Sequence, residues 1–126
     1  MTGNWFYEQN GSLFVPTELT RGPWDNNQQH GGPPAALLGR AIERFGPEAS
    51  ELFTVRLTFD FFRPVPLAPL EIHTTLIRSG KTVDRIEATL TNQQDIVMRA
   101  SGLRLRRRTL DVDAISTPPP IVPTPE

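Results

Sequence analysis

The chain has 126 residues, with 13 Lys and Arg against 14 Asp and Glu, and a formal net charge of −1. That length fits one domain with a single core, and the nearly neutral charge gives no overall attraction to nucleic acid or to membranes. The absence of Cys excludes disulfides, thiol catalysis and Cys-based metal sites. The first residues lack the basic and apolar segments of a signal peptide, and no apolar run is long enough to span a membrane. We therefore expect a cytoplasmic protein.

Residues 5–15 are predicted to form a β-hairpin, because aromatic and β-branched residues flank the turn signal Asn10-Gly11. Residues 16–32 form a long polar connection, and loops of this length in a small domain are often functional. The loop leads into a predicted helix, whose first turn suits Pro33 and Pro34. The apolar face of this helix comprises Ala35, Ala36, Leu37, Leu38, Ala41, Ile42 and Phe45, and Gly46-Pro47 ends it.

Four predicted strands follow the helix, at residues 51–63, 69–78, 82–91 and 95–107. The first of them alternates, with Phe53, Val55, Leu57, Phe59 and Phe61 predicted on one face. Consecutive strands joined by short turns favour an antiparallel sheet. The predicted fold class is therefore α+β, with the sheet wrapped around one central helix.

Prolines dominate the end of the chain, where five of the 13 lie in residues 118–126. Proline removes backbone donors, and few side chains in this stretch could pack. We predict a folded domain over residues 1–110 and a Pro-rich linker or tail over residues 111–126. An ordinary frayed C-terminus would have the same composition.

Two further patterns have structural as well as functional interpretations. Ser79-Gly80-Lys81-Thr82 resembles the end of a phosphate-binding loop, but Thr75 stands where that motif needs Gly, so a hairpin turn is favoured. Five arginines concentrate positive charge near the end of the last strand and could contact the phosphates of a nucleotide-bearing ligand such as coenzyme A. A solvated strand face is the favoured interpretation, and nucleic-acid binding lacks its aromatic platform. The five are Arg99, Arg104, Arg106, Arg107 and Arg108.

The stretch His30-Gly31-Gly32 stands directly before the predicted helix. Two glycines at a helix start allow close approach to the backbone, and the free N–H groups there favour negative charge. This arrangement suits an oxyanion hole, which stabilises a carbonyl oxygen under attack. A plain helix entry with two glycines is the alternative.

The sequence resembles the N-terminal hotdog domain of the acyl-CoA thioesterase II-like family over about residues 5–108. The resemblance is carried by Phe14-Val15-Pro16-Thr17, Arg21-Gly22-Pro23-Trp24, the stretch from His30 to Ile42, Phe61-Phe62-Arg63-Pro64, and Ser79-Gly80-Lys81-Thr82. It implies a hotdog fold. Members of that family carry two hotdogs in one chain, so this sequence looks like the first hotdog with its linker.

The catalytic positions of relatives are occupied differently here. In double-hotdog thioesterases an Asp, a Thr and a Gln of the second hotdog activate water, and the equivalent positions hold Arg56, Ser79 and Ala100. Single-hotdog relatives with a His-Gly-Gly helix start carry an acid further along the helix, where this sequence has Gly39. Asp25 in the loop and Asp60 in the first long strand remain as candidate bases, and Asp60 is more simply explained as a partner of an Arg.

The resemblance implies a thioesterase-type module that hydrolyses acyl-CoA thioesters or helps to hydrolyse them. The candidate site residues are Gly31, Gly32, His30 and Asp25, with a carboxylate from another hotdog to position water. The alternative is a non-catalytic half that binds acyl-CoA or dimerises. No metal or other cofactor is required, and the implied partners are the acyl-CoA substrate and either a second copy or a second hotdog. A hotdog dehydratase is a third option that no residue favours.

Overall fold

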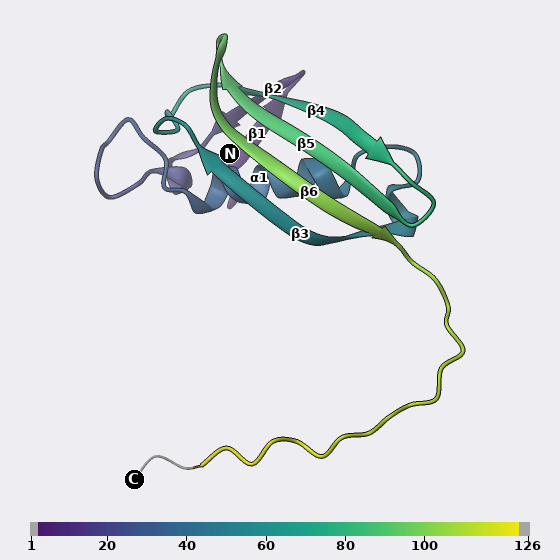
Figure 1. Cartoon of the computed structure of the whole chain (residues 1–126). Coiled ribbons are helices and arrows are strands. Elements are labelled where there is room, and N and C mark those ends of the chain that lie inside the picture. The colour runs from purple at the N-terminus through teal and green to yellow at the C-terminus, as the bar shows by residue number, and fades with distance from the viewer. Residues whose placement is uncertain (1–2, 124–126) are drawn as a thin grey trace.

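A six-stranded antiparallel sheet packs against one helix in the computed structural model, which describes residues 3–123 (Figure 1). The strands lie in the order β1-β2-β4-β5-β6-β3, and the fold class predicted from the sequence is confirmed. Short 3-10 helices cover Glu18–Thr20 and Ala49–Glu51. The main elements are β1 (Tyr7–Asn10), β2 (Leu13–Pro16), α1 (Gly32–Glu43), β3 (Leu52–Phe61), β4 (Leu70–Ser79), β5 (Val83–Asn92) and β6 (Asp95–Arg106).

The core lies between α1 and the concave face of the sheet. Leu38 and Ile42 of α1 are fully buried, and each such side chain contributes roughly 1.5–3 kcal/mol when it leaves water. Gly102 of β6 lets the helix approach closely, since a Cβ there would lie 2.7 Å from Cγ2 of Ile42. The sheet contributes the fully buried side chains Leu70, Ile86, Leu90 and Met98.

The N-terminal hairpin is confirmed, but its turn lies one residue later than predicted. Asn10 pairs with Leu13, so Gly11 and Ser12 are the two turn residues, and Gly11 has φ of +61°. A positive φ at the first central position belongs to a type II′ turn, which selects glycine there. The later turn at Ser79-Gly80-Lys81-Thr82 is also confirmed, because it joins antiparallel β4 to β5.

The predicted alternation of β3 is broken by a β-bulge between Thr54 and Arg56. Phe53 pairs with Leu105, whereas Leu57 pairs with Gly102, which is three residues away on β6. Because side chains alternate along a strand, Phe53 and Leu57 point to opposite faces. The prediction that they share a face is therefore wrong, and half-exposed Phe53 lies on the side away from the helix.

Arg104 is buried, which contradicts the prediction of a solvated strand face. Its Nη1 donates to the carbonyl oxygen of Ile42 (3.0 Å), in the last turn of helix α1, and to that of Phe45 (2.8 Å), just beyond the helix. Its Nη2 lies 3.3 Å from a carboxylate oxygen of buried Asp84, whose other oxygen accepts from the Ser79 hydroxyl. The Ile42 carbonyl also accepts from the N–H of Phe45 at 3.3 Å. The positive charge of Arg104 beside the last carbonyls complements the helix dipole.

Two other arginines of the cluster are paired with carboxylates at the surface. Arg99 lies 3.4 Å from Asp60, and Arg106 lies 2.7 Å from Glu48 and 2.8 Å from Glu51. These pairs tie β6 to β3 and to the segment before β3. The carboxylates of Asp60, Glu48 and Glu51 neutralise the positive charge with which these arginines would otherwise attract the phosphates of a ligand.

The C-terminal tail is exposed and has no regular structure from Arg107 to Pro123, and it leaves the sheet in an extended path (Figure 1). We expect that removing residues 116–126 leaves the free energy of unfolding within about 1 kcal/mol of the full chain, because residues 116–123 are exposed and bury little surface. Urea denaturation of the two chains measures the difference. A larger loss would mean that the tail docks on the domain.

Candidate active site at the start of helix α1

The loop before α1 is held by hydrogen bonds rather than being structureless. Arg21 and Gln29 form an isolated β-bridge, which closes the loop between them. The backbone N–H of His30 donates to the carbonyl of Thr20 at 2.8 Å, and Thr20 itself is fully buried. These contacts fix where the chain enters the helix.

The helix start presents two backbone N–H groups. Gly31 is the N-cap with φ of −71°, and the first helical bond runs from the Ala35 N–H to the Gly31 carbonyl at 3.3 Å. Pro33 and Pro34 have no N–H to offer. Within residues 3–123, no protein acceptor is found for the N–H of Gly31 or of Gly32. Both donors are therefore available to a ligand, as the sequence predicts for this stretch.

The two glycines are not required by the backbone conformation, because neither has a positive φ. A Cβ on Gly31 would lie 3.4 Å from Cζ of Phe61, and one on Gly32 would lie 3.5 Å from the ring of His30. His30 is half-buried, and its ring meets the edge of Phe6 with centroids 6.5 Å apart. The ring of Phe61 therefore lies close to Gly31, and the ring of His30 lies close to Gly32.

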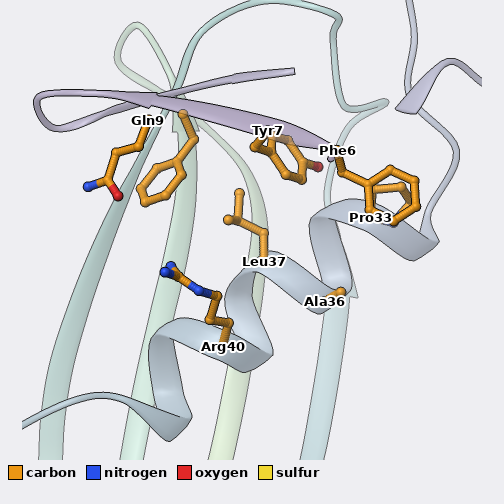
Figure 2. A pocket seen from close by; sticks show the side chains of 8 residues that line it. Phe6, Tyr7, Gln9, Pro33, Ala36, Leu37 and Arg40 are labelled. Atoms are coloured by element: carbon orange, nitrogen blue, oxygen red, sulfur yellow. The ribbon is translucent and has the colours of Figure 1, made fainter. Parts of the chain in front are cut away.

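An apolar pocket of about 300 Å³ adjoins this helix start, between the β1–β2 hairpin and α1 (Figure 2). Phe6 and Pro33 lie at one end, and Gln9 and Arg40 lie at the other. The helix contributes a stripe with helical spacing, of which the sequence analysis assigned Ala36 and Leu37 to the apolar face. The hairpin wall was not predicted, because it depends on the hairpin folding over the helix. The lining residues are Phe6, Tyr7, Gln9, Phe14, Pro33, Ala36, Leu37 and Arg40.

Tyr7 links the hairpin to the loop that precedes the helix. Its hydroxyl donates to Oε1 of Gln29, whose Nε2 donates to the carbonyl of Pro66 at 2.8 Å. Burial raises the pKa of Tyr7 above its ordinary value, so the hydroxyl remains protonated and remains a donor at neutral pH. This chain of hydrogen bonds holds one wall of the pocket in place.

The two candidate bases, Asp25 and Asp60, lie outside the pocket beside α1. Asp25 is exposed in the loop, where its Oδ1 accepts from the N–H of Asn27 at 2.7 Å, and it does not line the pocket. Asp60 lies 3.4 Å from Nη2 of Arg99, the pairing that the sequence analysis favoured for it. Asp25 thus contacts its own loop and Asp60 contacts strand β6, and neither contacts the helix start.

The positions that relatives use for catalysis are dispersed here. Gly39 is buried, and a Cβ there would lie 3.4 Å from Cδ1 of Leu57, so it faces β3. Ala100 is fully buried in the core, Arg56 is exposed on β3, and Ser79 ends β4. In the described part of the chain, no group of three or more His, Asp or Glu is placed to hold a metal ion.

The sheet, the single helix and the glycine-rich helix start define a hotdog domain of the thioesterase superfamily. Residues 20–105 match the family described as the acyl-CoA thioesterase N-terminal domain, and the chain belongs to that family. The resemblance seen in the sequence is thereby confirmed. No curated protein matches the chain.

Solved structures share the fold at low sequence identity. The PaaI protein of E. coli, from the phenylacetic acid degradation operon, has TM-score 0.64 and 20% identity over 76% of this chain and 70% of that one. A Bacillus halodurans protein solved with CoA has TM-score 0.64 and 20% identity, covering 82% and 74%. The tesB protein of Mycobacterium avium subspecies paratuberculosis has TM-score 0.61 and 19% identity, covering 90% of this chain but 44% of its own.

Helix α1 is the longest helix within residues 3–123. Helix α1 has 12 residues, and no helix in this range is long and apolar enough to cross a bilayer.

Proposed function

We propose that this domain takes part in the hydrolysis of acyl-CoA thioesters to a carboxylate and free coenzyme A. The observation that carries the proposal is the pair of unpartnered N–H groups at Gly31 and Gly32, beside an apolar pocket. Attack of water on a thioester places negative charge on its carbonyl oxygen, and two aligned amides at a helix start stabilise that charge. The Bacillus halodurans relative solved with CoA supports the ligand class.

We further propose that the carboxylate that positions water comes from another hotdog. In this chain the positions used by relatives hold Gly39, Arg56, Ser79 and Ala100, none of which is an acid. Asp25 is engaged with the N–H of Asn27. A base must lie within hydrogen-bond reach of the water that it activates, and no carboxylate of the described chain lines the pocket.

A second candidate function is a non-catalytic half that binds acyl-CoA or dimerises. The same missing carboxylates favour it, as does the size of the tesB protein, of which this chain covers 44%. Under this alternative the pocket would still receive an acyl chain.

Release of free coenzyme A by the purified chain separates the two candidates. Octanoyl-CoA is supplied as substrate, and the released thiol is followed with a chromogenic thiol reagent. Release above the spontaneous rate supports hydrolysis by this chain and its copies. Binding of octanoyl-CoA without any release assigns the chain to the binding half and contradicts hydrolysis by this domain alone.

We also expect the chain to pair with a second hotdog, either another copy or a further domain. Strand β3 is a ten-residue edge of the sheet formed by the described residues, where it pairs with β6 alone, and it exposes Phe53 (41%), Val55 (43%) and Phe61 (51%). Unpaired edges of this length invite pairing, so two sheets would continue across the interface. Light scattering at micromolar concentration should give the mass of a dimer or larger, and a compact monomer would contradict this expectation.

A further inference from the structure

The far end of the apolar pocket carries a cation. Pro33, Ala36, Leu37 and Arg40 follow one another along one stripe of α1 and face the hairpin. Arg40 lies seven residues after Pro33, which is about two turns or about 10 Å along the helix. A ligand whose reactive end lies at the helix start would therefore reach Arg40 with its other end.

Arg40 has no acidic partner in the described part of the chain. None of the ion pairs formed within residues 3–123 includes it. Glu43, one turn further along, lines a different pocket with Phe53 and Arg107. Gln9 lies across from Arg40 and donates one N–H to the carbonyl of Gly11 at 3.2 Å. Its side chain is a neutral amide, so it supplies no negative charge.

We propose that this pocket accepts acyl chains that end in a carboxylate, with the guanidinium of Arg40 as the partner of that group. The proposal rests on the proposed function, because it places the thioester at Gly31 and Gly32. The apolar walls formed by Phe14 and Leu37 suit the methylene groups between the two ends. Arginine stays charged at all relevant pH values, and its planar donors match a carboxylate.

The preference for an acyl chain that ends in a carboxylate over one that ends in a methyl group should be moderate, because Arg40 is exposed to solvent. Exposed ion pairs typically give up to about 1 kcal/mol, which corresponds to about a fivefold preference. Without the guanidinium the preference should reverse, because a carboxylate would then enter an apolar pocket with no partner.

The test compares two ligands that differ only at the distal end. The probes are hydrolysis-resistant ketone analogues of octanoyl-CoA and of suberoyl-CoA, its ω-carboxy counterpart, in which a methylene group replaces the thioester sulfur. Isothermal titration of the full chain should show about fivefold tighter binding of the suberoyl analogue. The variant Arg40→Met should lose or reverse that ratio. The matched control Arg44→Met removes the same charge just after α1, outside the pocket, and should keep it.

Equal affinities for the two analogues, binding of neither, or an unchanged ratio in Arg40→Met would each overturn the proposal. A loss of the ratio in Arg44→Met would also overturn it, since the effect would then come from net charge. The titration requires no turnover. A chain that keeps the ratio but releases no coenzyme A from octanoyl-CoA therefore contradicts hydrolysis by this domain alone and supports the carboxylate subsite.

Discussion

The variant Gly32→Val is expected to hydrolyse an acyl-CoA about 100- to 1000-fold more slowly than the unmodified chain or assembly, the usual cost of losing one oxyanion donor. A Cβ at this position lies at an ordinary 3.5 Å from the His30 ring, so the fold should tolerate a side chain. The branched side chain would instead stand between the amide and the substrate. The measurement is the rate of coenzyme A release, after circular dichroism has confirmed that the variant is folded.

Asp25→Asn is the matched control for that experiment. Asparagine keeps the oxygen that accepts from the N–H of Asn27, so the loop should keep its shape. If the base comes from another hotdog, removing this charge changes the rate only slightly. Loss of activity in Asp25→Asn with activity kept in Gly32→Val would make the loop carboxylate catalytic, and the assignment of the helix start would be wrong.

Arg104→Met is expected to lower the free energy of unfolding by about 3–5 kcal/mol, a large share of the stability of a domain of this size. The change leaves the carboxylate of Asp84 buried without its partner and strips two donors from the carbonyls of Ile42 and Phe45. Chemical denaturation measures the loss.

The control for Arg104→Met is Arg99→Met on the same strand. Arg99 lies at a similar 3.4 Å from its carboxylate, Asp60, but both side chains are nearly half-exposed. Exposed ion pairs contribute about 0–1 kcal/mol, so this variant should lose much less stability. Equal losses in the two variants would show that burial of the Arg104–Asp84 pair is not what makes it important.

The elements that could be predicted are those whose signals lie within short stretches of sequence. The helical period of the stretch after Pro33 and the turn residues between the strands depend on near neighbours. The helix and the hairpins were confirmed, with the first turn displaced by one residue. The position of the helix start could also be predicted, because Gly31, Gly32 and the two prolines are consecutive in the sequence. The catalytic role of His30-Gly31-Gly32 stays a prediction. A helix start is local chemistry, so its geometry can be inferred before any tertiary contact is known.

The features that sequence reasoning missed depend on distant segments. Arg104 donates to the carbonyl of Ile42, which lies 62 residues away in the chain, and the sequence around Arg104 does not indicate that partner. The bulge beside Val55 was hidden because the apolar alternation continues through it, and one extra residue exchanges the two faces. The pocket was missed because its walls come from the hairpin and the helix, which meet only in the folded chain.

The two prolines at the start of α1 determine which anionic groups this helix start can bind. A helix that binds phosphate usually surrounds several oxygens with consecutive amides. Here Pro33 and Pro34 remove the next two donors, so only the N–H groups of Gly31 and Gly32 remain. Such an end can hold a single oxygen well and a multi-oxygen group poorly. The phosphates of coenzyme A would then compete weakly with the thioester carbonyl for this position, which favours one orientation of the bound substrate.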